Sequence, residues 1–143
     1  NKISQGQYEV TINDHKKGVV KRLTEETELS AIAEHDTLVY SFNGALAYIN
    51  GHAHVARFST GLNGYKNVIL RLRELHFIDT DGVDALDEII DIVHEQGKKV
   101  LISSINNQVV KVLARECEGY NDLKKQRLVF KSTEDALAYL KKH

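Results

Sequence analysis

The residues most suited to chemistry form one short turn, Asp79-Thr80-Asp81-Gly82, between an apolar stretch and a helical pattern. The apolar stretch ends at Ile78, directly before the turn. Carboxylates beside a hydroxyl are compatible with acid–base chemistry, with a phosphorylation switch or with a helix cap. The other features of the sequence bear on which of these roles is favoured.

The simplest role for these four residues is structural. Asp79 or Thr80 can cap the N-terminus of the helix, and Asp81 in the first turn suits the positive end of the helix dipole. Gly82 permits the backbone of the helix to approach the sheet closely. Helix capping alone therefore explains every residue type in the turn.

Nucleotide binding and hydrolysis find no support in the sequence. The chain lacks the Gly-x-Gly-x-x-Gly and Gly-x-x-x-x-Gly-Lys-Ser/Thr loops, and it lacks Gly-x-Ser-x-Gly. A helix N-terminus attracts anions, but Asp79 and Asp81 would repel a bound phosphate. We therefore expect no enzymatic activity, no cofactor and no metal site. Phosphorylation of Thr80, which would add about −1.5 to −2 charges to a docking face, stays open.

Length and composition limit the possible functions. A chain of 143 residues with 42% hydrophobic and 27% charged residues is predicted to form one globular domain, residues 1–143. The net charge of −1 offers no field for nucleic acid, so we expect no nucleic-acid partner. The single cysteine permits no internal disulfide, and no apolar run approaches the roughly 18 to 20 residues that span a bilayer. The absence of any Met indicates a fragment of a longer protein.

The second half of the chain alternates strand and helix patterns. Strands are predicted over residues 67–73, 98–102 and 128–130, each followed by a helix. The first of these helices covers residues 83–96, and Asn106 and Ser132 are predicted to cap the next two. Short helical crossovers favour parallel strands with the helices packed on the sheet.

The first half is predicted to add an antiparallel edge. Residues 8–23 read as a hairpin, and the glutamate-rich residues 24–36 as a surface connection or a short helix. A strand over residues 37–43, a short edge strand over 45–48 and a helix over 52–62 follow. The predicted fold class is α/β, with a mixed, mostly parallel sheet, an antiparallel N-terminal edge and about four packed helices.

The turn carries a resemblance to a known family. The stretch FIDTDGVDAL resembles the signature turn of STAS domains, the fold shared by sulfate transporters and anti-sigma-factor antagonists. In that family the pattern is an apolar residue, any residue, Asp, Ser or Thr, any residue and Gly, followed by an apolar helix. The hydroxyl directly after the Asp is the one that a partner kinase phosphorylates in the free-standing antagonists. Carried over to this sequence, that residue is Thr80.

A second stretch, YSFNGALAYINGHAHVARF at residues 40–58, is similar to a loop of sulfate-permease C-terminal domains. That loop reads Gly-Pro-Leu-Phe-Phe-Ala-Asn before a helix. The positions that match are Gly44, Leu46, Tyr48 and Asn50. The positions that depart from it are Ala45, Ala47 and Ile49. Without the resemblance, the same residues read as a plain edge strand followed by an Asn-Gly turn.

The resemblance to sulfate-permease (SulP) domains implies a non-enzymatic, cytoplasmic regulatory or interaction domain of an anion transporter. It would act by protein contact around the turn Asp79-Thr80-Asp81-Gly82, the expected interaction loop, and the helix over residues 83–96. Residues 1–7 would be a flexible lead-in from a preceding membrane region, and the domain would lie at the cytoplasmic face of the inner or plasma membrane. The implied partners are the transmembrane domain of the same parent chain, a second protomer or soluble cytoplasmic proteins. Weak nucleotide binding, sometimes proposed for the family, has no specific support here. The alternative is a free-standing anti-sigma-factor antagonist or stress-complex subunit, switched by phosphorylation of Thr80.

Three further features of the sequence could take part in binding. His52 and His54 are two residues apart, so on a helix they point to different faces and are predicted to be surface histidines rather than metal ligands. Cys117 falls on an apolar stripe and is predicted to be a small core residue. Charged groups on the helices are predicted to be solvated, or to dock partners of opposite charge. The acidic group is Asp84, Asp87, Glu88, Asp91 and Glu95, and the basic groups are Lys124, Lys125 and Arg127, and Lys141 with Lys142.

Overall fold

The computed structural model describes residues 20–24, 27–32, 36–60 and 64–143, and for residues 20–24 and 27–32 the backbone only. The predicted lead-in at residues 1–7 and most of the predicted hairpin at residues 8–23 lie outside these ranges.

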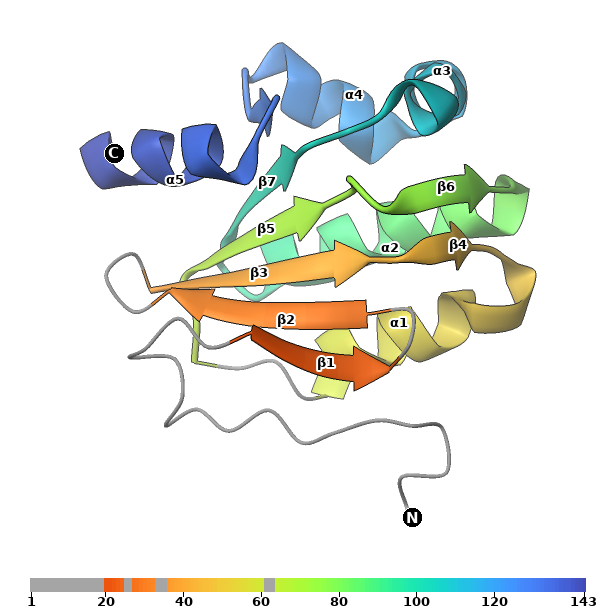
Figure 1. The fold of residues 1–143 in the computed structure, drawn as a ribbon, viewed down its shortest axis with the longest axis horizontal. Helices are drawn as coiled ribbons and strands as arrows, with labels where there is room; N and C mark the ends of the chain where they lie inside the picture. The colour runs from red at the N-terminus through yellow and green to blue at the C-terminus, as the bar shows by residue number, and fades with distance from the viewer. Residues whose placement is uncertain (1–19, 25–26, 33–35, 61–63) are drawn as a thin grey trace.

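Within the described ranges, six strands form one mixed sheet in the order β1-β2-β3-β5-β7-β8 (Figure 1). The strands β3, β5, β7 and β8 pair parallel to one another, as the alternating strand and helix patterns predict. At the other edge, β2 pairs antiparallel with both β1 and β3. The bounds are β1 Val20–Thr24, β2 Thr27–Ile32, β3 Thr37–Phe42, β5 Asn67–Arg71, β7 Lys99–Ser103 and β8 Val129–Phe130.

The strand β2 corrects the prediction for residues 24–36. These residues were expected to form a surface connection or a short helix, but Thr27–Ile32 pairs with β3 over its whole length. The many glutamates suggested a solvent-exposed segment. Pairing with the fully buried strand β3 outweighs that composition, because strand formation depends on the neighbouring strand more than on intrinsic preference.

The described residues contain five helices, against about four expected. The extra helix arises because Cys117 adopts an extended conformation and separates α3 from α4. Two helices begin earlier than predicted, α1 by four residues and α2 by three. None of the described helices is both long and apolar enough to cross a bilayer. The bounds are α1 Tyr48–Thr60, α2 Thr80–Glu95, α3 Asn107–Glu116, α4 Glu118–Lys125 and α5 Thr133–Lys142.

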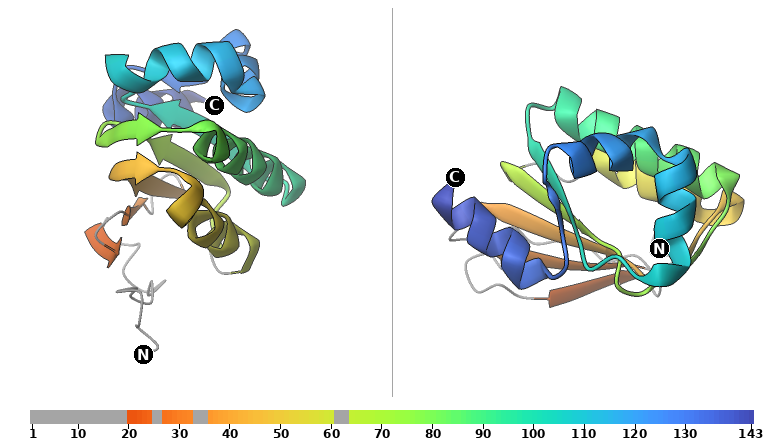
Figure 2. Two further views of the ribbon diagram at one scale, coloured as in Figure 1. Left: turned by 90° about the vertical axis from the view of Figure 1, so that its right-hand side faces the viewer. Right: turned by 90° about the horizontal axis from the view of Figure 1, so that it is seen from above.

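The helices cover both faces of the sheet. Figure 2 shows α1 and α2 on one face and α5 on the other. On β7, Lys99 lies over the ring of Tyr139 in α5, and the Ser103 hydroxyl bonds with Thr133 at 2.9 Å. Since side chains alternate along a strand, the buried Val100 and Ile102 point to the opposite face.

A second, two-stranded sheet lies beyond the ends of β3 and β5 and carries the site residues. It pairs β4, Gly44–Leu46, in parallel with β6, Leu75–Ile78. Each strand leads directly into a helix, β4 into α1 and β6 into α2. This arrangement places the starts of both helices at the same end of the molecule (Figure 1).

Candidate functional site

Asp79 is the N-cap of α2. Its backbone is extended, and its Oδ1 accepts a hydrogen bond of 2.7 Å from the backbone N–H of Gly82. The cap satisfies one of the N–H groups that have no partner in the first turn of a helix. The structure therefore confirms the capping role and assigns it to Asp79 rather than to Thr80.

The same carboxylate reaches a second helix. Asp79 Oδ2 lies 3.4 Å from the backbone nitrogen of Tyr48, the first residue of α1. One negative group thus lies between the positive ends of two helix dipoles, where it stabilises both. The turn and the loop at residues 44–50 that resembles sulfate permeases, which we call the family-motif loop, were predicted as separate features. They meet at this carboxylate.

Gly82 brings α2 against the backbone of β4. A Cβ atom at this position would lie 1.9 Å from the carbonyl oxygen of Leu46 and 2.8 Å from Cγ1 of Ile78. No side chain fits there, so the buried glycine permits the close approach that the sequence predicts. The start of α2 therefore packs directly on the two-stranded sheet of β4 and β6.

Asn50 closes the family-motif loop from inside. Its Oδ1 accepts from the backbone N–H of Ala47 at 2.9 Å, and its Nδ2 donates to the carbonyl of Ala45 at 2.8 Å. Because Ala47 directly precedes the helix, the first bond repeats the backward half of a capping box. Asn50 and Gly51 are therefore part of α1, and the expectation of a turn before a helix starting at residue 52 is wrong.

The other loop residues divide between core and surface. Gly44 has a φ of +86°, which favours glycine, and the side chain of Leu46 is fully buried. By contrast, Tyr48 is 72% exposed and Ile49 is 89% exposed. The buried Leu46 and Asn50 thus anchor the loop, while the side chains of Tyr48 and Ile49 face solvent.

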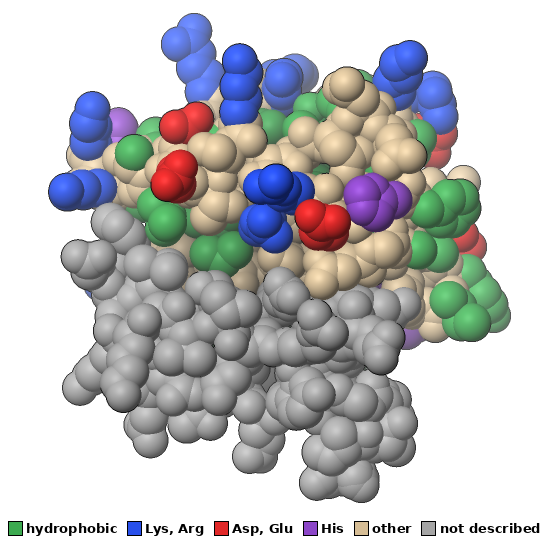
Figure 3. All heavy atoms as spheres, in the orientation of Figure 1, with side chains coloured by type: hydrophobic (Ala, Val, Ile, Leu, Met, Phe, Trp, Pro, Cys, Tyr) green, Lys and Arg blue, Asp and Glu red, His purple; other side chains and the backbone are tan. Residues whose placement is uncertain are grey.

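Three exposed hydrophobic residues lie at this end of the domain, and we call Tyr48, Ile49 and Phe77 the apolar end patch. Phe77 is 55% exposed, and in the two-stranded sheet it pairs with Ala45 of β4. Figure 3 shows hydrophobic side chains gathered at the right-hand edge, over the ends of β4 and β6 and the start of α1. Exposed groups of this kind are typical of interaction surfaces. Phe77 lies two residues before the turn and was not among the site residues predicted from the sequence.

The remaining turn residues border this patch. Thr80 and Asp81 are exposed at the start of α2, Asp79 is half-buried, and Gly82 is buried. The expected interaction loop is therefore only half accessible, and its exposed half is Thr80 with Asp81. The structure places a free surface at the hydroxyl that the family resemblance singles out, next to the apolar end patch.

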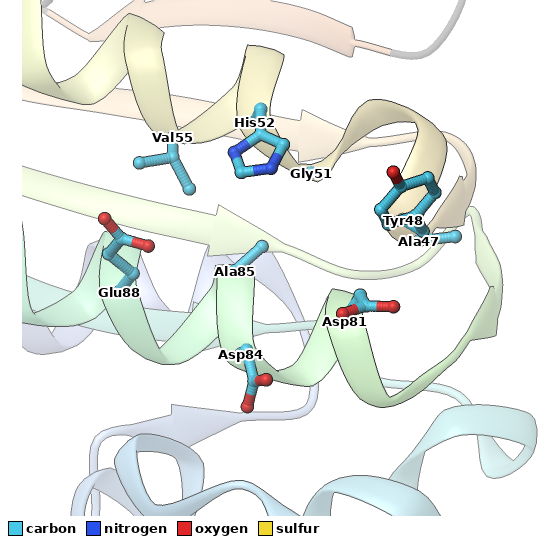
Figure 4. Close-up of a pocket in the computed structure, with 9 residues that line it drawn as sticks. All are labelled: Ala47, Tyr48, Gly51, His52, Val55, Asp81, Asp84, Ala85 and Glu88. Carbon is cyan, nitrogen blue, oxygen red and sulfur yellow. The ribbon is translucent and has the colours of Figure 1, made fainter.

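A groove runs between α1 and α2 beside the turn (Figure 4). Its volume is about 240 Å³. One wall carries carboxylates from α2, and the other carries Tyr48, His52 and Val55 from α1. The lining residues are Ala47, Tyr48, Gly51, His52, Val55, Asp81, Asp84, Ala85 and Glu88.

Comparison with known proteins identifies the family. The family model described as STAS domain matches residues 28–136. The chain belongs to the STAS domain family. STAS domains are non-catalytic, which confirms the expectation that this domain is not an enzyme. A comparison with curated protein sequences found no match.

Solved structures similar to this STAS domain come from both branches of the family. The STAS domain of a SulP transporter from Vibrio cholerae is 30% identical, with a TM-score of 0.60, covering 73% of this chain and 80% of that one. A sulfate transporter family protein from Wolinella succinogenes is 24% identical, with a TM-score of 0.62, and the match covers 74% of this chain and 85% of that one. The anti-sigma factor antagonist SpoIIAA, in its unphosphorylated form, is 17% identical, with a TM-score of 0.64, and the match covers 82% of this chain and 97% of that one. The last two likenesses show a common fold.

The two histidines of α1 have different environments in this STAS domain. His52 is exposed, but His54 is buried, so the prediction that both lie on the surface is wrong for His54. The Nδ1 of His54 lies 2.7 Å from the hydroxyl of Tyr40 and 3.1 Å from Arg57. Burial, and to a smaller extent the charge of Arg57, lowers the pKa of His54 to about 3. In the part of the chain that the structure describes, no cluster of three or more potential metal ligands occurs.

Cys117 and Asp87 hold α4 against α2. Cys117 is fully buried, as predicted, and burial is the main cause that raises the pKa of its thiol to about 12. Its Sγ donates to Oδ1 of Asp87 at 3.2 Å, and the same oxygen accepts from the backbone N–H of Gly119 at 2.7 Å. Asp87 therefore caps the start of α4 and is not part of a solvated acidic face. Asp84, Glu88, Asp91 and Glu95 are exposed as predicted, and so are both basic clusters.

Substitutions in the turn should separate the cap from the exposed hydroxyl. Asp79→Ala is expected to lower the free energy of unfolding by about 1 to 2 kcal/mol, because α2 loses its cap and α1 loses the nearby carboxylate. Thr80→Ala, one residue further on, is the control and should change it by less than about 0.5 kcal/mol. Urea denaturation measures both values. Equal losses in the two variants would contradict the assignment of the cap to Asp79.

Proposed function

We propose that this STAS domain is a cytoplasmic regulatory and protein-interaction domain of a sulfate-permease-type anion transporter. The observation that carries the proposal is the 30% identity with the Vibrio cholerae SulP transporter domain over most of both chains. The antagonist SpoIIAA reaches only 17%. The family-motif loop at Gly44, Leu46, Tyr48 and Asn50 supports the same branch, since the resemblance there is to sulfate permeases.

The domain would act through the end that carries the apolar end patch. Burying one large hydrophobic side chain in an interface contributes about 1.5 to 3 kcal/mol, so three neighbouring ones supply a substantial driving force for binding. The exposed Thr80 and Asp81 form a polar border beside them, as is usual for interfaces. The proposed partner is the transmembrane domain of the same parent chain, with a second protomer or soluble proteins as further partners.

The test uses the full-length protein that contains this chain. Replacing Ile49 and Phe77 together by serine is expected to lower the uptake of labelled anion several-fold, because the patch no longer docks. The melting temperature of the domain should hardly change, since both side chains are exposed. Replacing Lys141 and Lys142 by serine, on the exposed last turn of α5, is the control and should leave uptake unchanged.

Two results would refute the transporter proposal. One is a parent gene without several apolar spans of about 20 residues. The other is normal uptake in the Ile49 and Phe77 double variant when this variant and the Lys141 and Lys142 control are both folded.

The second candidate function is that of a free-standing antagonist switched at Thr80. It is favoured by the exposure of Thr80 at the first residue of α2, where the helix dipole would stabilise an added phosphate. The flanking Asp79 and Asp81 oppose that charge. Incubation with a cognate kinase and ATP, followed by mass measurement, decides this case. The candidate is rejected if no phosphate is added, or if Thr80→Ala is labelled equally.

A further inference from the structure

The α1–α2 groove is formed by two small residues where the helices cross. A Cβ atom on Gly51 would lie 3.2 Å from the Cβ of Ala85, so the two backbones are close together at this point. The longer side chains stand on either side of this floor. On α1 these are Tyr48, His52 and Val55, and on α2 they are Asp81, Asp84 and Glu88, each set spaced to follow one side of its helix (Figure 4).

The groove is locally negative, although the whole chain has a net charge of only −1. Among the residues that the structure describes, the three carboxylates of Asp81, Asp84 and Glu88 line the groove, and no Lys or Arg does. All three are exposed, and in the described part of the chain none of them forms an ion pair. An anion such as a phosphate would be repelled from this wall, whereas a cation would be attracted.

The size and the apolar wall favour a protein segment over a free small molecule. A volume of about 240 Å³ is below the roughly 300 to 1,000 Å³ of most small-molecule sites, but it suits one or two side chains of a docked partner. Val55 and Ala85 offer an apolar surface, and the exposed ring of Tyr48 can contact either an apolar group or a cation. The groove is continuous with the apolar end patch because Tyr48 belongs to both.

We propose that the α1–α2 groove binds a cationic amphipathic segment of a partner protein. Lys or Arg side chains of the segment would lie against Asp81, Asp84 and Glu88, and an apolar side chain would lie against Tyr48 and Val55. The proposal names the partner chemistry for the interaction role proposed above and rests on that role. It commits to a protein segment because charge complementarity requires a cation and the apolar wall requires an accompanying hydrophobic group.

The experiment measures peptide binding to the chain of residues 1–143. The probe is a fluorescent amphipathic peptide of lysine and leucine, and its counterpart of glutamate and leucine serves as the negative control. We expect the lysine peptide to bind, to perturb the NMR signals of Gly51, His52 and Ala85, and to bind several-fold more weakly in high salt. The glutamate peptide should not bind.

A matched pair of variants locates the site. Asp81→Asn with Glu88→Gln should weaken binding about tenfold, since exposed ion pairs contribute a few-fold each. Asp91→Asn with Glu95→Gln removes the same charge from the same helix outside the groove and should have little effect. Equal affinities of the two double variants, no binding of the lysine peptide, or equal binding of both peptides would each overturn the proposal.

These outcomes are independent of the transporter assignment. If the peptide does not bind but the Ile49 and Phe77 variant still loses anion uptake, the groove proposal fails and the transporter role stands. If the peptide binds in the groove but the parent gene has no apolar spans, the transporter role fails and the groove remains a docking site for a cationic segment.

Discussion

Gly82→Ala is expected to lower the free energy of unfolding by about 3 kcal/mol or more, a large part of the roughly 5 to 15 kcal/mol of a typical domain. The added methyl group would lie 1.9 Å from the Leu46 carbonyl oxygen and 2.6 Å from its carbon, both backbone atoms of β4. A backbone neighbour cannot rotate away as a side chain can. The start of α2 would therefore have to move off the small sheet. Urea denaturation followed by circular dichroism gives the value.

Gly51→Ala is the matched control for this prediction. Both glycines lie near the start of a helix, and both substitutions add helix propensity. A Cβ on Gly51, however, would lie 3.2 Å from the Cβ of Ala85 and 3.9 Å from the backbone oxygen of Asp81, and neither distance is as short as those at Gly82. We expect a change within about 1 kcal/mol in either direction. If Gly82→Ala were as mild as Gly51→Ala, the close packing of α2 on β4 would be wrong.

The second large effect concerns acid and His54. The pKa of His54 is about 3 in the folded domain, whereas an unperturbed histidine has a pKa of 6.5. The unfolded chain therefore binds the proton more readily, and protonation favours unfolding. The contribution to stability is complete above about pH 6.5 and is lost as the pH falls towards 3. The full loss amounts to about 5 kcal/mol, since the pKa falls from 6.5 to about 3 and one pKa unit corresponds to roughly 1.4 kcal/mol.

The measurement compares the pH dependence of stability in two variants. His54→Gln removes the titrating group from the core, so its free energy of unfolding should fall less steeply than that of the wild type between pH 6.5 and pH 3. His52→Gln removes an exposed histidine two residues away and should follow the wild type. The three proteins carry the same carboxylates, so the comparison isolates the histidine that is replaced. Parallel curves for His54→Gln and the wild type would show that His54 is not kept neutral by burial.

Much of the fold was predictable because its signals are local. The strong apolar stripe of α2, the caps at Asp79, Asn106 and Ser132, and the alternation of strands and helices each depend on residues close together in the chain. The parallel pairing follows from short helical crossovers. These elements needed no knowledge of distant contacts.

The predictions from the sequence are wrong where the local structure depends on residues that are distant in the chain. Asn50-Gly51 reads as a turn until the Asn50 side chain is seen bonding the loop behind it. The burial of His54 depends on Tyr40, 14 residues away in β3. The separate helix α4 depends on Asp87, which bonds Gly119 across 32 residues. No local pattern in the sequence reports such pairings.

The candidate site shows the same division. The turn at Asp79, Thr80, Asp81 and Gly82 was predicted from its own residue types, whereas the loop before α1 was predicted from its resemblance to sulfate-permease domains. Their contact through one carboxylate was not, nor was the groove, because both require α1 and α2 to lie side by side. The small residues Gly51 and Ala85 are the signal in the sequence that permits this neighbourhood, but they identify it only once the pairing is known.

The carboxylate of Asp79 couples the two helix starts mechanically. A force that draws the first turn of α1 outwards at Tyr48 must either break the contact to Asp79 or drag the first turn of α2, and Thr80 with it. Docking at one helix and modification at the other would then share a free energy of coupling, equal in both directions. If the proposed functions hold, a partner bound at Tyr48 would therefore change the free energy of adding a phosphate at Thr80, and the phosphate would change the affinity for the partner by the same amount.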